Sequence, residues 1–360
     1  MKTKLLIVLG GFEIGGAQNM VYELLRCIDR TVYEVDVLCY GKQLDNDLSN
    51  KIEQIQSVRY LGVKEKITPK IIVRVLNEIS RYKPDVVHAH LGGTIFAVLW
   101  GILHHKPVVV TAHTKPEKAF SKAILPFLRI GLKAHIVKLV AVSRENQNLL
   151  TKYFNLESNK CEFVNNGINL GRYYKKEHEH FTFINVGRQD DNKNQAVIIR
   201  CFAKIHNEYP HVMLYLVGDG NRHNDLIYEV KDLELTDNII FSGNVGNTED
   251  YYAIADCYVQ SSHREALPLT ALEAMATGLP LVSTNVGGMK DIISNQNGFL
   301  IDDNNEEFLY TAMKAMVEMP QEKLTSMGNE SLKKIDEYSS EKMAKRYEEI
   351  YSQRRQRNGR

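Results

Sequence analysis

Two glutamates, Glu265 and Glu273, stand eight positions apart around the predicted start of a helix. A short apolar run before them predicts a buried strand, and a polar turn follows that run. Pro268 suits the first turn of a helix, because its ring fixes φ near the helical value and its missing N–H is not needed there. Leucine and alanine then recur at helical spacing until the Gly-Leu-Pro sequence at 278–280 ends the helix.

The two carboxylates flank a position where a phosphate would be stabilised. A helix N-terminus presents unpaired N–H groups and the positive end of the helix dipole. Glu265 precedes this end, and Glu273 lies about four residues inside the helix, roughly 6–9 Å further along. Because carboxylates accept pairs of hydroxyl hydrogen bonds, one could hold a sugar and the other a ribose. The alternative is that both are solvated charges on a helix surface.

Two cations, Arg188 and Lys193, follow another apolar run that predicts a buried strand at Phe181–Val186. A helix is predicted to begin near Asn194, directly after them. Two cations at this spacing could clamp a diphosphate, since arginine supplies a bidentate fork and lysine a point charge. The alternative is a pair of ordinary surface charges.

The segment around the glutamates resembles the E-x7-E signature of the retaining GT-B glycosyltransferases of family 4. The residues in register with that signature are Ser262, Glu265, Glu273, Ala274, Met275, Ala276, Gly278 and Pro280. One departure is that the family often has Gly-aromatic-Gly after the first glutamate, where this chain has Ala-Leu-Pro. Pro268 cannot donate an N–H to phosphate. Contacts to the donor are therefore expected from Ala266, Leu267 or Leu269.

The resemblance extends over nearly the whole chain, with the motifs in the family's order. It implies that Arg188 and Lys193 bind the donor diphosphate through a G-R-x-x-x-x-K segment, although its insert at 189–191 is more acidic than usual. Further matching positions are Gly15 and Gly16 in a G-G-A-Q loop, Gly187, Gly218 in a V-G-x-G-like turn, Val245 beside the nucleotide base, and an N-G-I turn at 166–168 at the domain junction.

Short apolar runs separated by amphipathic helices predict parallel sheets covered on both faces. The predicted strands are Leu5–Leu9, Val35–Cys39, Val86–Ala89, Val108–Thr111, Leu139–Val142, Phe181–Val186, Val212–Val217, Ile239–Phe241, Cys257–Val259 and Leu281–Val282. A polar, Asn-rich segment at 165–180 separates two such series and is the natural linker.

We therefore predict an α/β fold with two Rossmann-like, doubly wound domains facing a central cleft, with ligands beyond the strand C-termini. The resemblance implies the GT-B arrangement, with residues 1–170 as the acceptor domain and 171–339 as the nucleotide-sugar donor domain. It also implies that a C-terminal helix, within 340–360, crosses back to the first domain. The basic residues 354–360 are expected to form a disordered tail.

Histidines lie at or near the ends of two predicted strands. We interpret His88 and His90 as pointing to opposite faces of their strand, so that one metal ion could not easily bind both; packed, hydrogen-bonded rings are the alternative. The resemblance gives His113 the role of a cleft histidine that helps to hold the donor hexose. The glycine-rich loop at 10–18 fails the dinucleotide-binding fingerprint on spacing. Residues 45–47 spell a D-x-D metal motif, which we interpret as a surface loop.

The amino-acid composition of the chain limits the classes of protein to which it can belong. With 360 residues, of which 44% are hydrophobic, the chain can bury a large core, and we predict two domains. The 45 basic and 44 acidic residues balance, so no global charge argues for nucleic acid. Five scattered cysteines without a C-x-x-C motif indicate reduced thiols in a cytosolic protein. No apolar stretch approaches the ~20 residues of a membrane span.

The segment Ser121–Val140 carries basic side chains among apolar ones and contains no acid. A basic amphipathic helix of this kind can lie on an anionic membrane surface, through residues such as Lys122, Arg129, Lys133 and Lys138. The alternative is an ordinary domain helix with a solvated cationic face. We expect a cytoplasmic protein with possible peripheral membrane contact.

Taken with these residues, the resemblance implies a retaining glycosyltransferase that needs neither metal nor cofactor. It would move a hexose from a nucleotide-diphosphate sugar, with a UDP-sugar favoured, to a glycan or lipid-linked glycan in cell-surface or capsular polysaccharide synthesis. Arg188 and Lys193 would stabilise the leaving diphosphate, Glu265 would orient the donor sugar and Glu273 the ribose. The alternatives are a nucleotide-sugar 2-epimerase of the same fold and a nucleotide-binding module without activity.

Overall fold

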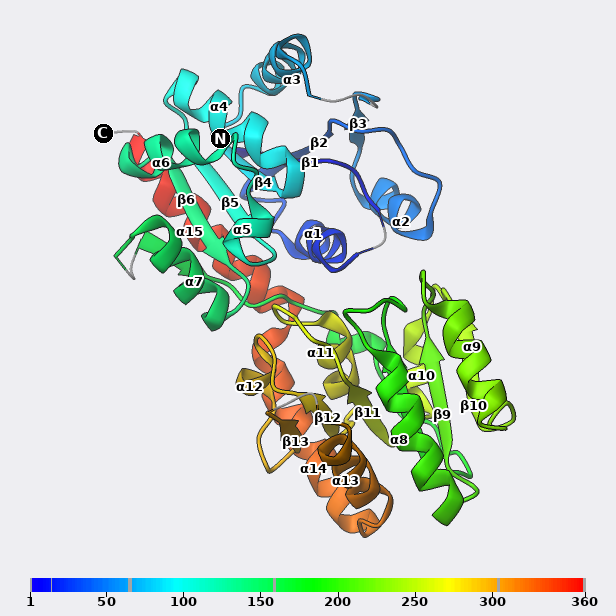
Figure 1. Ribbon diagram of the computed structural model, residues 1–360. Coiled ribbons are helices and arrows are strands. Elements are labelled where there is room, and N and C mark those ends of the chain that lie inside the picture. The colour runs from blue at the N-terminus through cyan, green and yellow to red at the C-terminus, as the bar shows by residue number, and fades with distance from the viewer. Residues whose placement is uncertain (1, 14, 64–66, 158–159, 303–304, 359–360) are drawn as a thin grey trace. The chain divides into compact units, whose positions relative to one another are not determined.

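The computed structural model describes residues 2–13, 15–63, 67–157, 160–302 and 305–358 of the chain. Two compact units are present (Figure 1). Unit 1 comprises Met1–Gly167 together with Ser340–Arg360, and unit 2 comprises Ile168–Ser339. Each unit contains one parallel sheet with helices on both faces, so the predicted α/β class with two Rossmann-like domains is confirmed.

Unit 1 is built on a seven-stranded parallel sheet in the order β3-β2-β1-β4-β5-β6-β7. Its strands are β1 (Thr3–Leu9), β2 (Tyr33–Cys39), β3 (Val58–Tyr60), β4 (Val86–His90), β5 (Val108–Ala112), β6 (Val137–Ala141) and β7 (Cys161–Phe163). The strand order reverses at β1, between β2 and β4. A crevice at the carboxyl ends of β1 and β4 is therefore the expected ligand position in this unit.

Helices bury both faces of this sheet, which explains why its strands are continuous apolar runs. The helices are α1 (Gly16–Cys27), α2 (Asp47–Ile55), α3 (Pro69–Tyr82), α4 (Thr94–His104), α5 (Pro116–Ala119), α6 (Leu125–Lys133), α7 (Arg144–Phe154) and α15 (Ser340–Asn358). Side chains of α1, α2 and α15 share one core, and those of α3, α4, α6 and α7 share the other.

Unit 2 has a six-stranded parallel sheet in the order β10-β9-β8-β11-β12-β13. Its strands are β8 (Thr182–Val186), β9 (Met213–Val217), β10 (Ile239–Gly243), β11 (Cys257–Gln260), β12 (Leu281–Thr284) and β13 (Gly298–Ile301). Its helices are α8 (Gln195–Glu208), α9 (His223–Asp232), α10 (Thr248–Ala253), α11 (Leu269–Ala276), α12 (Met289–Ile292), α13 (Glu306–Val317) and α14 (Gln321–Ile335). The helices α8, α9 and α13 contribute to one core, and α10, α11 and α12 to the other.

Helix α15 belongs to unit 1 although the whole of unit 2 precedes it in the sequence. Tyr347 and Tyr351 are fully buried in it, and their hydroxyls form hydrogen bonds with Thr111 (2.9 Å) and His88 (2.6 Å). The guanidinium of Arg354 is buried and donates to backbone carbonyls of the segment that precedes β6. The expectation of a disordered tail from this residue onward is therefore wrong through residue 358.

Local signals explain two further differences from the predicted elements. The predicted surface loop at 45–47 is present only through Asn46, because the Asn46 side chain accepts a hydrogen bond from the Ser49 N–H (2.9 Å) and caps α2, which begins at Asp47. Pro268 precedes α11 as its N-cap residue and is not in its first turn. The short strands β3, β7 and β13 were not predicted.

Replacing Tyr351 with Phe should lower the free energy of unfolding of unit 1 by about 1–3 kcal/mol, because the Nδ1 atom of His88 would lose its partner in a buried site. The only tryptophan of the chain, Trp100, is buried in α4 of unit 1, so its fluorescence in a urea titration reports this unit. Tyr153→Phe is the control, since Tyr153 is a partly exposed tyrosine on α7 of the same unit, and should change little. An unchanged midpoint for Tyr351→Phe would contradict the role of this bond.

Candidate functional site

The predicted donor residues of unit 2 lie at one edge of its sheet. Gly187 and Arg188 follow β8, Gly218 follows β9, Val245 follows β10, and Glu265 follows β11. All these strands are parallel, so their carboxyl ends meet at the same edge. The structure thus brings together residues that are widely separated in the sequence.

Two loops at this edge are tied to each other, the β8 loop (187–194) and the β11 loop (261–268). The hydroxyl of Ser261 donates to the backbone carbonyl of Asn194 (2.8 Å). The side-chain amide of Asn192 donates to the carbonyl of Arg264 (3.0 Å). These bonds hold the phosphate-binding segment that the sequence predicts against the start of the E-x7-E motif.

The side chains of the two motifs also meet. The Nζ atom of Lys193 lies 2.6 Å from the Oε1 atom of Glu265, with only 19% and 13% of the respective side chains exposed. One of the three lysine N–H donors is used in this contact, which leaves donors for a further anion. An ammonium group and a carboxylate thus stand side by side where a diphosphate and a sugar hydroxyl could both be bound.

Arg188 is held differently. Its side chain is 77% exposed, and its Nε atom donates to the Oδ2 atom of Asp190 (2.7 Å). The other carboxylate oxygen of Asp190 accepts the backbone N–H groups of Asn192 and Lys193, both at 3.0 Å. The acidic insert that departs from the family pattern therefore organises the β8 loop and holds the arginine.

Glu273 is largely buried in α11, so it is not the solvated helix charge of the alternative interpretation. Burial raises the pKa of this carboxyl, while hydrogen bonds from Tyr252 and Tyr173 and the charge of Arg172 oppose that increase. Arg172 itself donates to both carboxylate oxygens of Glu249 (2.9 and 3.0 Å). These tyrosine and arginine residues are the partners of Glu273 that sequence reasoning missed, because they lie outside the matching motifs.

Two glycines are required by close backbone approaches at this edge. Gly218 has φ 122°, and a Cβ atom there would lie 2.2 Å from the carbonyl oxygen of Gly187. Gly287, after β12, has φ 59°, and a Cβ atom there would lie 2.2 Å from the carbonyl oxygen of Glu265. Both positions combine a left-handed or otherwise Gly-specific φ with no space for a side chain.

The remaining predicted contacts of unit 2 surround α11. The carbonyl of Ala266 accepts the N–H of Gly288 at 2.5 Å, and Leu267 is buried. Leu269 is the first residue of α11. Val245 is partly buried and packs against the core of α10 and α11.

In unit 1, the glycine-rich loop follows β1. Gly15 is the N-cap residue of α1 and Gly16 its first residue, while residue 14 lies outside the described part of the chain. The side-chain amide of Gln18 donates to the Oε2 atom of Glu13 (3.3 Å). The loop therefore presents the backbone of a helix N-terminus beside the strand-order reversal.

The prediction that His88 and His90 point to opposite faces of β4 is wrong. Residues two apart on a strand share a face, and the two ring centroids lie 4.0 Å apart. The Nδ1 atom of His90 is 2.9 Å from the Nε2 atom of His113, which follows β5. The Nε2 atom of His88 is 2.8 Å from the hydroxyl of Thr111. The alternative of packed, hydrogen-bonded rings therefore describes them.

Comparisons with known proteins agree with this geometry. The family described as "Glycosyl transferases group 1" matches residues 172–334, and "Glycosyltransferase Family 4" matches residues 14–172. The chain belongs to glycosyltransferase family 4. The matches divide between the two units close to their boundary, at 167 and 168.

Two similar proteins come from an archaeal and a bacterial species, Methanocaldococcus jannaschii and Escherichia coli. An uncharacterized glycosyltransferase of Methanocaldococcus jannaschii is 27% identical over 237 residues, which are 59% of this chain and 58% of that protein. The UDP-Gal:alpha-D-GlcNAc-diphosphoundecaprenol alpha-1,3-galactosyltransferase of Escherichia coli is 26% identical over 273 residues, 68% of this chain and 69% of that protein. The chain thus spans between half and three-quarters of the length of these two relatives.

Among solved structures, HepE of Anabaena in complex with UDP has the same fold. Its TM-score is 0.81 at 18% identity, and the superposition covers 98% of this chain and 100% of that one. This likeness supports the GT-B class of the fold.

Burial away from opposite charges keeps the rings of His88, His90 and His113 neutral. It lowers the pKa of His88 to about 3 and that of His113 to about 4, and the pKa of His90 also falls well below its ordinary value. Tyr347 and Tyr351 of α15 also contact His88. Among the described residues, no carboxylate forms a hydrogen bond or ion pair with any of the three rings, and no group of His, Cys, Asp and Glu is arranged to hold a metal ion.

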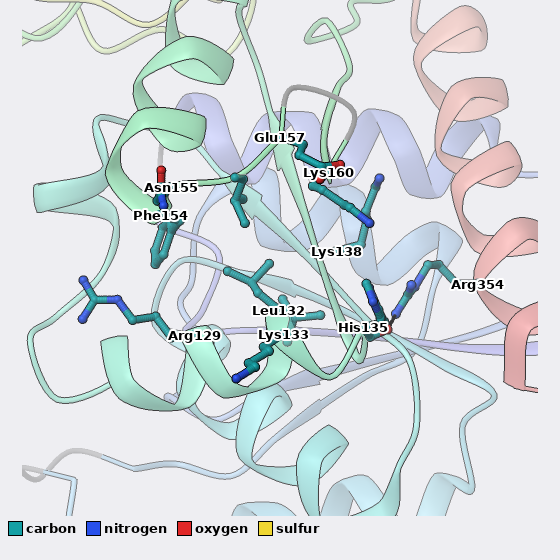
Figure 2. A pocket seen from close by; sticks show the side chains of 12 residues that line it. Arg129, Leu132, Lys133, His135, Lys138, Phe154, Asn155, Glu157, Lys160 and Arg354 are labelled. Atoms are coloured by element: carbon teal, nitrogen blue, oxygen red, sulfur yellow. Dashed lines mark hydrogen bonds between the residues drawn. The ribbon is translucent and has the colours of Figure 1, made fainter.

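Unit 1 contains a cavity of about 330 Å³ (Figure 2). Its lining includes Arg129 and Lys133 of α6, Lys138 of β6, Lys160, and Arg354 of α15. The segments that line it precede β6 and β7, so the cavity lies at the amino ends of these strands, opposite the carboxyl edge that carries His113. No helix in the described part of the chain is long and apolar enough to cross a membrane.

Unit 1 should lose stability as the pH falls from about 7 to about 5. The folded-state pKa values of the three histidines lie below the ordinary value near 6.5, so between these values the unfolded chain binds more protons than the native state. Their contribution is fully present above pH 6.5 and is lost progressively below it. Urea titrations followed by Trp100 fluorescence at several pH values measure this slope.

His90→Asn should flatten that pH dependence, because it removes one of the three rings. His105→Asn changes an exposed histidine of the same unit and is the matched control, with the slope of the parent expected. A free energy of unfolding that stays constant or rises toward pH 5 would refute the assignment.

Proposed function

We propose that this chain is a retaining hexosyltransferase that uses a nucleotide-diphosphate sugar, with a UDP-sugar favoured, and a glycan or lipid-linked glycan acceptor. The observation that carries the proposal is the 2.6 Å contact between Lys193 and Glu265. It joins the predicted phosphate-binding segment to the E-x7-E motif at the carboxyl edge of one parallel sheet. A chance pair of surface charges would not be mostly buried at this edge.

In the proposed reaction, the bond between the anomeric carbon and the diphosphate oxygen breaks, and the acceptor hydroxyl oxygen bonds to that carbon. Lys193 and Arg188 stabilise the charge that develops on the leaving diphosphate, and Glu265 orients hydroxyls of the donor sugar. The acceptor proton passes to the departing diphosphate, with attack on the face from which it leaves. Glu273 binds the ribose and His113 contacts the hexose. Because two cations serve the diphosphate, we propose that no metal ion is required.

Names of relatives support the choice of donor and acceptor. The Escherichia coli relative is named for UDP-Gal and for a sugar carried on diphosphoundecaprenol, and the Anabaena structure contains UDP. We therefore propose a UDP-sugar and a lipid-linked acceptor, in the synthesis of cell-surface polysaccharide.

Lys193→Ala should weaken binding of the donor about 10- to 100-fold, because a hydrogen bond to a charged group contributes roughly 1.5–3 kcal/mol. Thermal shifts with UDP-, GDP- and ADP-sugars in EDTA measure this, since a ligand that binds the folded state raises its melting temperature. Lys314→Ala is the matched control, because Lys314 of α13 and Glu208 of α8 form a pair at the same 2.6 Å distance, with 27% and 45% of their side chains exposed.

The same experiment separates the alternatives. If no nucleotide sugar stabilises the parent, or if Lys193→Ala binds the donor as well as the parent does, the proposed donor site is wrong. Formation of an epimer without acceptor would favour the 2-epimerase, and binding without transfer or hydrolysis would favour a binding module. The anomeric configuration of the transferred sugar, determined by NMR, tests retention.

We also propose that the segment Ser121–Val140 makes peripheral contact with anionic membranes. In α6, Phe127 and Ile130 are 40% and 53% exposed, and Arg129 and Lys133 are exposed beside them. Apolar and cationic side chains on one exposed helix suit the interface of an anionic bilayer. Lys138 does not join this surface, because it lies in β6 and pairs with Glu162 at 2.9 Å.

The triple variant Lys122/Arg129/Lys133→Glu should abolish co-sedimentation with vesicles that contain phosphatidylglycerol, since each nearby cation contributes about 1 kcal/mol to such binding. Lys2/Lys42/Lys70→Glu makes the same change in net charge at other exposed positions of unit 1 and should leave binding intact. Failure of the parent to bind anionic vesicles would rule the contact out.

A further inference from the structure

We propose that His90 is a positioning residue that determines which ring nitrogen of His113 carries the proton. His90 is the last residue of β4 and is fully buried, and His113 follows the neighbouring strand β5. The Nδ1 atom of His90 and the Nε2 atom of His113 are 2.9 Å apart. This distance is that of a hydrogen bond, so one nitrogen holds a proton and the other a lone pair.

Either His113 donates to His90 in this contact or His90 donates to His113. The second nitrogen of His90 decides which of the two is present. Its Nε2 atom is buried and has no hydrogen-bond partner. If His113 donated to His90, the single proton of the neutral His90 ring would sit on this Nε2 atom as a buried N–H without an acceptor. If His90 donates through Nδ1, the Nε2 atom holds only a lone pair. Unpaired buried donors are the rarer and more costly of the two.

His90 is therefore the hydrogen-bond donor. Its proton lies on Nδ1, and Nε2 of His113 is the acceptor. A neutral imidazole has one N–H, so that of His113 must lie on its Nδ1 atom. Both rings are neutral near pH 7, because burial lowers the pKa of each. His113 thus presents an uncharged N–H donor on the nitrogen that does not face His90.

The surroundings of His90 keep its ring in place. The ring lies against His88, which is itself held by Thr111 and Tyr351 through both of its nitrogens. The next residue, Leu91, has φ 49°, a left-handed conformation that a leucine adopts only when the surrounding structure imposes it. The contact with His88 and the imposed backbone conformation of Leu91 thus both restrict the position of the His90 ring.

An uncharged N–H donor suits the oxygen of a sugar hydroxyl and cannot remove a proton from it. This consequence rests on the proposed function, in which His113 contacts the donor hexose. His113 would then orient the hexose by donation, and loss of its tautomer would misplace the sugar and not the diphosphate.

The test is long-range ¹H–¹⁵N NMR of the ring nitrogens in the full-length protein labelled with ¹⁵N-histidine, without any substrate. The parent should show His113 protonated on Nδ1. His90→Phe, which removes the donor but keeps a ring, should move the proton of His113 toward Nε2, the tautomer that free histidine favours. His90→Asn keeps an amide N–H near the position of Nδ1 and should retain the parent's tautomer. His104→Phe is the control at an exposed histidine of the same unit.

In transfer assays, His90→Phe should lower kcat about 10- to 100-fold with little change in the melting-temperature shift caused by the donor, and His90→Asn should restore most of the rate. A parent His113 protonated on Nε2 would overturn the inference, as would a tautomer that is unchanged in His90→Phe. If His90→Phe does not fold, the parent and His90→Asn spectra still decide. A parent that transfers no sugar would refute the proposed function and not the tautomer assignment.

Discussion

The candidate donor site depends on one mostly buried contact, the ion pair between Lys193 and Glu265. Each group loses hydration at this position, and only a partner at hydrogen-bond distance compensates for that loss. The pair therefore couples the loops after β8 and β11, and the Ser261 and Asn192 hydrogen bonds reinforce the coupling. Because the lysine retains N–H donors, an anion can bind it without leaving either charge buried alone.

The two units present different chemistry at the carboxyl edges of their sheets. Unit 2 supplies charges, which suit a diphosphate, whereas the buried rings of unit 1 are neutral because no carboxylate among the described residues pairs with them. A neutral donor such as His113 can bind a hydroxyl oxygen without attracting the diphosphate. In the proposed reaction, Glu265 therefore orients the sugar as a charged acceptor of hydroxyl hydrogen bonds, whereas His113 orients it as an uncharged donor.

The sequence could predict the elements that continuous apolar runs define, and the predicted strands Leu5–Leu9 and Val86–Ala89 lie within β1 and β4. It could also predict Lys193 and Glu265, because each lies in a local motif. It could not predict that they touch, nor that Tyr173 and Tyr252 oppose the rise in the pKa of Glu273 caused by burial, because both effects depend on how distant segments pack. The shared face of His88 and His90 does follow from the sequence, because side chains two residues apart on a strand point to the same face.

Asp190 shows how a departure from a family pattern can be read physically. A carboxylate beside the predicted phosphate-binding arginine would be expected to oppose an anionic ligand. In the structure it closes the β8 loop through two backbone N–H groups and holds Arg188 by a single Nε contact. Water screens this contact because the Arg188 side chain is 77% exposed. Surface ion pairs contribute only about 0.2–1 kcal/mol, whereas a bidentate contact between arginine and phosphate is stronger. Asp190 therefore keeps Arg188 near the candidate donor site, and Arg188 can exchange this contact for one with a diphosphate.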